Sequence, residues 1–265
     1  MTQGPLMQYE RSKRVYASSK LVGEYVGRKL NAGEETVLEV IRPALTGKRV
    51  LELGCGAGAV TQRLLASSDD VVGLDVSPAM IEHCQAAFPG GTFVVGDLRD
   101  LTRFTSGEFG AVVAAANVLD VLTHDERDGV FGEIRRVMAE GGIFYFSTHN
   151  RHSIEAVRNA IRGPRPALDR NPYWLLRGLV GYVIGAMNHR RLSRYTKLED
   201  DYAILNDDAH RWSLLHYYIT RDAQERELDK TGFKLGEVWA IDGRALSAGD
   251  DDSDSSELHY VARAV

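Results

Sequence analysis

A glycine-rich turn between two apolar segments constrains this 265-residue chain more than any other feature. Residues 50–53 have the composition of a β-strand, and Gly54, Gly56 and Gly58 follow it directly. A second apolar segment, residues 71–75, ends in Asp75. Glycines let the backbone approach a ligand closely because they have no Cβ atom, and an acid at the end of the next strand accepts hydrogen bonds from ribose hydroxyls. The pattern predicts a doubly wound sheet that binds a nucleoside-type cofactor.

The spacing of the glycines indicates which cofactor is bound. Dinucleotide sites favour G-x-G-x-x-G, whereas this turn has the spacing G-x-G-x-G, with Glu52 two residues before the first glycine. The pattern resembles motif I of the class I S-adenosylmethionine (SAM)-dependent methyltransferases. SAM carries a sulfonium and an ammonium group, so an acid beside the turn is electrostatically favourable. The resemblance implies a SAM site; the residues that we expect to form it are Glu52, Gly54, Cys55, Gly56, Asp75, Val76, Met80, Asp97, Leu98 and Asn117. We interpret Cys55 as a small structural side chain that fits within the turn.

Three later segments are similar to the same family and follow in the same order. Residues 93–98 resemble the third strand and its acidic end, where the resemblance implies that Asp97 bonds the adenine amino group. Residues 111–116 are a continuous apolar run, which is typical of a strand buried on both faces. Residues 135–146 resemble a helix that ends at Gly141, a double-glycine turn and a fifth strand.

The resemblance implies an α/β fold with a doubly wound, mostly parallel seven-stranded sheet and a helical lid insertion. We expect four segments: an N-terminal helical cover in residues 1–47, a SAM-binding core in 48–150, a helical lid in 151–211 and completion of the sheet in 212–265. Three tyrosines of the cover either close the SAM pocket or pack within an amphipathic helix: Tyr9, Tyr16 and Tyr25. The lid shows no clear strand pattern. Its apolar residues 174–187 predict a lid helix or pocket wall, with a dimer or membrane-surface contact as the alternative.

The charge distribution bears on the partners of the chain. A net charge of −5 argues against nucleic acid as the main substrate, because phosphate contacts need a basic surface. The lid segment is basic between Arg151 and Lys197, where only Glu155 and Asp169 oppose its arginines. It is either a solvated helical surface or a lid that attracts an anionic small-molecule acceptor. We find no secretory signal and no stretch long enough to span a membrane, so we expect a cytoplasmic protein. We expect it to be a monomer or a homodimer.

Candidate catalytic residues lie at predicted strand ends. His149 ends the fifth strand and Asp120 follows the fourth, so His149 is a candidate general base paired with Asp120. Hydrogen-bonded structural roles are the alternative for each. His216 is a further candidate, and alternation places it on one strand face with Tyr218, opposite Tyr217. The sequence shows no metal-binding pattern, and we expect the acidic residues 250–254 to form a mobile, solvated loop.

These features predict SAM-dependent methyl transfer to a hydroxyl or amine of a small molecule, such as a specialised metabolite or modified sugar. The chain has Asn117-Val118-Leu119-Asp120 after the fourth strand in place of Asn-Pro-Pro-Tyr, which makes base amines and glutamine side chains poor candidates. Three alternatives stay open at this point. They are an RNA or protein methyltransferase, a non-catalytic SAM-binding module and a nicotinamide-linked dehydrogenase.

Overall fold

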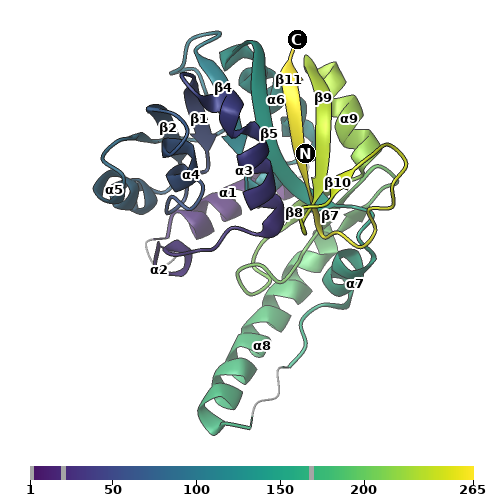
Figure 1. Ribbon diagram of the computed structural model, residues 1–265. Coiled ribbons are helices and arrows are strands. Elements are labelled where there is room, and N and C mark those ends of the chain that lie inside the picture. Colours follow the sequence, from purple (N-terminus) through teal and green to yellow (C-terminus); the bar gives the residue numbers. More distant parts are fainter. Residues whose placement is uncertain (1–2, 19–21, 167–169) are drawn as a thin grey trace.

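The computed structural model describes residues 3–18, 22–166 and 170–265, and a central sheet organises them (Figure 1). The main strands of the sheet are β1 (Arg49–Leu53), β2 (Asp70–Asp75), β3 (Thr92–Val95), β4 (Phe109–Ala114), β5 (Met138–Asn150), β9 (Phe233–Ala240), β10 (Ala245–Leu246) and β11 (Glu257–Ala264). They lie in the order β10-β9-β11-β5-β4-β1-β2-β3. Strands β1 to β5 pair in parallel, and β11 is antiparallel to both β5 and β9. The predicted doubly wound, mostly parallel sheet is therefore confirmed.

The sheet is larger than the seven strands predicted. Besides β10, it gains β6 (Lys197–Leu198), β7 (Tyr202–Leu205) and β8 (His216–Ile219), of which β8 pairs in parallel with the end of β5. Strands β6 and β7 lie in the segment for which we expected no strands, so that expectation was wrong. Both are too short, at two and four residues, to show a period-2 pattern in the sequence.

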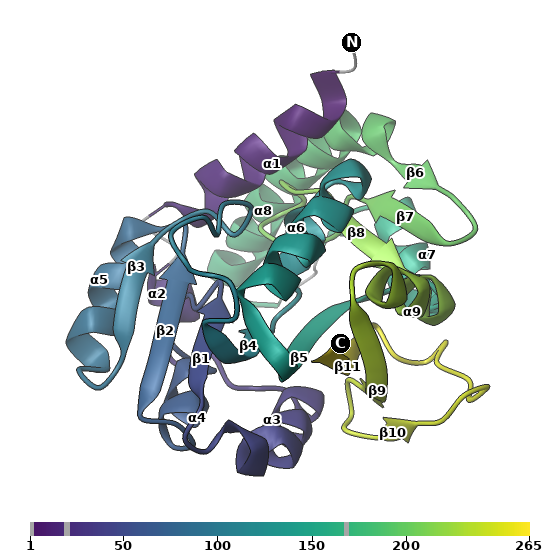
Figure 2. The ribbon, with the colours of Figure 1, turned by 90° about the horizontal axis from the view of Figure 1, so that it is seen from above.

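Helices cover both faces of the sheet, as Figure 2 shows. They are α1 (Gln3–Tyr16), α2 (Val22–Tyr25), α3 (Ala32–Leu45), α4 (Thr61–Leu65), α5 (Pro78–Ala87), α6 (His124–Val137), α7 (Ile154–Arg162), α8 (Pro172–Leu192) and α9 (Arg221–Lys230). Alternation along β1 places Val50 in the core that α3 and α4 cover, and Leu51 in the core that α6 and α9 cover. Both faces are apolar because helices bury both.

Helix α8 departs from this layered arrangement. It extends away from the sheet, with its N-terminal end farthest from the rest of the molecule (Figure 1). Of its 21 residues only Gly185 and Leu192 are buried. The apolar segment predicted from the sequence is therefore helical, but most of its side chains do not pack on the body of the protein.

Two local expectations were wrong. The sixth helix ends at Val137 and not at Gly141, because Met138 already pairs with Phe109 as the first residue of β5. The acidic segment 250–254 is not simply solvated. Asp252 is buried, and its backbone carbonyl accepts a hydrogen bond from Asn150 Nδ2 at 2.7 Å.

The N-terminal cap of α6 permits a stability test. Thr123 and Glu126 form a capping box, in which the Glu126 carboxylate accepts a hydrogen bond from the Thr123 backbone N–H at 3.0 Å. Thr123→Ala removes the hydroxyl that donates to the Glu126 carboxylate at 2.9 Å and so weakens the capping box, and we expect it to lower the free energy of unfolding by about 1 kcal/mol. Urea denaturation monitored by circular dichroism measures this change. An unchanged unfolding midpoint would show that the cap contributes nothing.

Candidate active site

The glycine turn and the end of β2 form one cradle. Gly54 and Gly56 have positive φ angles of 66° and 51°, a region that side chains disfavour, and a Cβ on Gly54 would lie 2.2 Å from a methyl carbon of Val118. The Asp75 carboxylate accepts hydrogen bonds from the backbone N–H groups of Gly56, at 2.9 Å, and Ser77, at 2.8 Å. Burial raises the pKa of Asp75, whereas these two bonds act in the opposite direction. The carboxylate is thus fixed at the strand end.

A cavity lies directly above this cradle, and most of the residues that we expected to bind SAM line it. The lining includes Gly54, Gly56, Asp75, Val76, Met80, Leu98 and Asn117. Asp97 is not part of the lining, although its neighbours Gly96 and Leu98 are. Its carboxylate instead accepts hydrogen bonds from the Arg99 guanidinium at 3.0 and 3.2 Å. The adenine-binding role expected for Asp97 stays a prediction.

Glu52 and Cys55 lie on the other side of the turn, where they line a second, smaller cavity that shares Gly54 and Gly56 with the first. Glu52 is 2% exposed and accepts a hydrogen bond from Thr61 Oγ1 at 2.5 Å. Burial raises its pKa to about 8, so a cation bound beside it would favour the ionised form. Cys55 packs against Ile81 and Cys84, in agreement with a structural side chain.

Asn117, which lines the first cavity, has an unused hydrogen-bond acceptor. It has a positive φ of 56°, and its Nδ2 donates to Glu257 Oε2 at 2.8 Å. Among the described residues, its buried Oδ1 has no hydrogen-bond partner. Buried polar atoms without a partner are rare. The cradle glycines, the fixed Asp75 carboxylate and this free acceptor together fit a cofactor with ribose hydroxyls and an ammonium group.

The N-terminal helices contribute to the same cavity. Tyr16 and Tyr25 both line it, and both contact His210 of the 206–212 loop. The rings of Tyr16 and His210 lie 5.1 Å apart, edge to face, and the Tyr25 hydroxyl is 3.2 Å from His210 Nε2. The predicted closing role thus has a geometric basis for these two tyrosines. The side chain of the third candidate, Tyr9, lies outside the part of the structure that is described.

The expected pairing of His149 with Asp120 is present. His149 Nδ1 lies 2.6 Å from Asp120 Oδ2, which also accepts the His149 backbone N–H at 2.7 Å. Thr148 Oγ1 donates to the other oxygen of Asp120 at 2.5 Å. Burial lowers the pKa of His149, but the hydrogen bond and charge of Asp120 outweigh it and raise the pKa to about 9. The imidazole is therefore oriented, with Nε2 free for a ligand.

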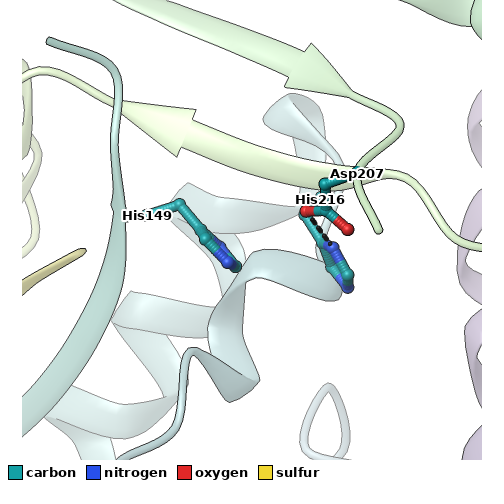
Figure 3. Close-up of side chains that lie close together, drawn as sticks. All are labelled: His149, Asp207 and His216. Carbon is teal, nitrogen blue, oxygen red and sulfur yellow. Dashed lines mark hydrogen bonds and ion pairs between the residues drawn. The ribbon is translucent and has the colours of Figure 1, made fainter. Parts of the chain in front are cut away.

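A second aspartate–histidine pair, Asp207 and His216, lies beside His149 (Figure 3). Asp207 Oδ2 accepts hydrogen bonds from His216 Nδ1, at 2.7 Å, and from the Tyr218 hydroxyl, at 3.0 Å. The rings of His149 and His216 stack with centroids 5.3 Å apart. One ligand atom from each of His149, Asp207 and His216 lies within 4.8 Å of the others, a spacing that could hold a metal ion. Because the Asp207 oxygens already accept three hydrogen bonds, including one from the Ala209 N–H at 3.1 Å, we interpret the group as a hydrogen-bonded network.

A groove of about 790 Å³ opens in front of the two histidine pairs, which is within the size range of small-molecule sites. His149, Asp207, Tyr218 and Glu257 line its inner end, and Gly181 and Tyr182 of α8 line another side. Glu257 also bonds Asn117 of the first cavity. The walls of the two spaces are therefore joined by the Asn117–Glu257 hydrogen bond.

Asp207 and Glu257 are two site residues that the sequence analysis missed. Glu257 begins β11, which is antiparallel to β5, so Glu257 pairs with His149 at the edge where the parallel strands end. The position of Glu257 at the start of a predicted closing strand was a usable signal. Asp207 lies in a loop between two short strands, and no sequence pattern pointed to it.

Comparisons with known proteins agree with this geometry. Residues 50–142 match the family model described as a methyltransferase domain. An uncharacterised methyltransferase of Synechocystis sp. is 37% identical over 98 residues, which are 37% of this chain and 45% of that protein. A ubiquinone biosynthesis O-methyltransferase of Methylococcus capsulatus is 29% identical over 125 residues, 45% of this chain and 51% of that one. This chain thus spans about half the length of the curated relatives that it matches.

Solved structures extend the likeness in fold to nearly the whole chain. A SAM-dependent methyltransferase of Mesorhizobium loti superposes with a TM-score of 0.60 at 20% identity, covering 88% of this chain and 98% of that one. The 1,6-didemethyltoxoflavin-N1-methyltransferase of Burkholderia thailandensis, solved with its acceptor and S-adenosylhomocysteine, gives a TM-score of 0.64 at 13% identity, with coverages of 100% and 92%. The strand order and the glycine cradle agree with the match of residues 50–142 to the methyltransferase domain family, and the solved SAM-dependent methyltransferase of Mesorhizobium loti shares the fold of most of the chain.

Proposed function

We propose that this protein transfers the methyl group of SAM to a hydroxyl or amine of a small molecule, with His149 as the general base. The observation that carries the proposal is the junction of the two spaces. The glycine cradle and Asp75 line one, and the His149–Asp120 pair lies at the inner end of the other. Enzymes of this kind place the acceptor atom in line with the transferred methyl group.

The proposed chemistry divides between cofactor and protein. Bound SAM supplies an electrophilic methyl group on its sulfonium. Asp75 holds the ribose, and the groove orients the acceptor so that its nucleophilic atom lies near His149 Nε2. Asp120 holds the imidazole by Nδ1, which leaves Nε2 to accept the acceptor's proton. Relatives named for methyl transfer to ubiquinone precursors and to a toxoflavin precursor support a small-molecule acceptor.

The His149 pKa sets an expected pH dependence. With a pKa of about 9, the imidazole is protonated at neutral pH and cannot accept a proton. We therefore expect kcat/KM to rise with pH and to level off above about pH 9. Asp120→Asn removes the charge that raises the His149 pKa, so the rise should move to lower pH by one unit or more. A rate that does not change between pH 6 and 10 would exclude His149 as the base.

Calorimetric titration with SAM, S-adenosylhomocysteine and NAD tests the cofactor half of the proposal. We expect both sulfur compounds to bind and NAD not to bind, because the turn lacks the dinucleotide glycine spacing. Tritiated SAM with panels of phenols, alcohols and amines then tests the acceptor half. Cofactor binding without any transfer would favour a non-catalytic SAM-binding module.

A further inference from the structure

Helix α8 carries an apolar face that nothing in the described chain covers. Leu176, Val180, Val183 and Met187 follow one another at spacings of four, three and four residues, so they form one stripe along the helix. Their side chains are 64%, 50%, 53% and 68% exposed. More than half of the large exposed hydrophobic residues in the described chain belong to this helix. Contiguous exposed apolar surfaces mark interaction sites.

Arginines are concentrated in the same segment of the chain as this stripe. Eight of them lie in the segment from α7 to the residues just after α8: Arg158, Arg162, Arg165, Arg170, Arg177, Arg190, Arg191 and Arg194. No ion pair within 4 Å joins any of them to an acid of the described residues. Arg177 lies over the ring of Trp174, 5.5 Å from its centroid, at the projecting end of the helix. The segment is thus strongly cationic in a chain whose net charge is −5.

The apolar stripe and the arginines together favour one of the partners that could cover the helix. A symmetric dimer through α8 would oppose the same face of two copies, and so bring two sets of arginines together. An anionic lipid surface satisfies both features, because acyl chains cover the apolar stripe and headgroups pair with the guanidinium groups. A tryptophan beside an arginine is typical of the membrane interface. None of the described helices is long and apolar enough to cross a membrane, so α8 would lie in the plane of the surface.

We propose that the outer face of α8 binds the surface of anionic lipid membranes. The opposite side of the helix is tied to the active site. His189 bonds Asn206 at 2.9 Å, Asn188 donates to the Arg211 carbonyl at 3.0 Å, and Gly181 and Tyr182 line the acceptor groove. Membrane binding through α8 therefore brings the groove to the lipid surface.

Vesicle flotation tests this proposal with the full-length protein. We expect binding to phosphatidylcholine vesicles that contain 30% phosphatidylglycerol to be at least tenfold tighter than binding to pure phosphatidylcholine vesicles, and to weaken with added salt. Leu176→Glu/Val183→Glu should lower binding to the anionic vesicles at least tenfold. The matched control is Val40→Glu/Val265→Glu, which adds the same charge at two exposed valines far from α8 and should bind like the wild type.

Three results would overturn the proposal: no binding to anionic vesicles, equal loss in the control variant, or a dimer that light scattering detects and that Leu176→Glu/Val183→Glu dissociates. The last result would assign the face to a second copy of the chain. Calorimetry of SAM binding on the same samples separates this proposal from the proposed function. A loss of vesicle binding with normal SAM affinity would bear on the membrane proposal for α8 and not on the methyltransferase activity. Vesicle binding without SAM binding would support the membrane proposal and refute the methyltransferase activity.

Discussion

Replacement of Asp75 by alanine is expected to lower SAM affinity by about 10²–10⁴-fold, because we propose the Asp75 carboxylate as the acceptor of two ribose hydroxyls. Hydrogen bonds to a charged group contribute about 1.5–3 kcal/mol each, and each 1.4 kcal/mol is a factor of about ten in Kd. The carboxylate is fixed before the ligand arrives, since Gly56 and Ser77 donate to it. Isothermal titration calorimetry with SAM and S-adenosylhomocysteine measures the loss.

Asp70→Ala is the matched control for this experiment. Asp70 begins the strand that Asp75 ends, is exposed, and lies beside Arg49 at 3.8 Å. It is at the opposite edge of the sheet from the cavity, so we expect unchanged affinity. Circular dichroism should show that both variants are folded. If Asp75→Ala binds SAM within threefold of the wild type, the ribose assignment is wrong.

Local patterns were enough to predict the cradle that the glycine turn forms with the end of β2. The turn at Gly54 follows a buried strand, Ser77 caps the next helix with its side chain 3.5 Å from the Met80 N–H, and Asp75 lies between them. Each of these features depends on residues close together in the sequence. A strand that ends in glycines leaves few alternative conformations, because only glycine adopts the positive φ angles without strain.

The acceptor half depends on contacts between distant segments, and the sequence predicted only part of it. His149 lies at the end of β5 and Asp120 lies in the turn after the neighbouring parallel strand β4, so the order of these two strands brings them together. Asp207 reaches the same place only because the four-residue strand β8 pairs with the end of β5, and no periodicity in the sequence reveals this pairing. The contact of Tyr16 and Tyr25 with His210 joins residues nearly two hundred positions apart.

The sequence also could not predict which way the apolar face of α8 points. Residues 174–187 are apolar around much of the helix, and such a pattern is equally compatible with a buried helix, a pocket wall or an interface. The contacts of Gly185 with Trp212 and of His189 with Asn206 decide which side faces the body. The remaining apolar side chains point away from the body. The arginines favour a lipid surface over a second copy of the chain as the partner of this face.

The second large effect, on turnover, is expected when His149 is replaced. His149→Ala removes the proposed base, so turnover of a hydroxyl acceptor should fall by about 10²–10⁴-fold, while SAM affinity stays within about twofold because the side chain does not line the SAM cavity. Asp120→Asn leaves an imidazole in place but weakens its orientation, so its kcat should lie between those of the wild type and His149→Ala. Initial rates with tritiated SAM at saturating acceptor measure both variants.

His152→Ala controls for the loss of a histidine near this strand end. The His152 side chain is 51% exposed and contacts Asp252, not the groove, so we expect wild-type turnover. Added imidazole should partly restore the rate of His149→Ala if the missing group is a base, since a small base can then occupy the space of the ring. A purely structural histidine would not respond to imidazole, and its loss would alter thermal stability together with activity. Full turnover by His149→Ala would instead indicate an amine acceptor that enters the site already neutral and needs no base.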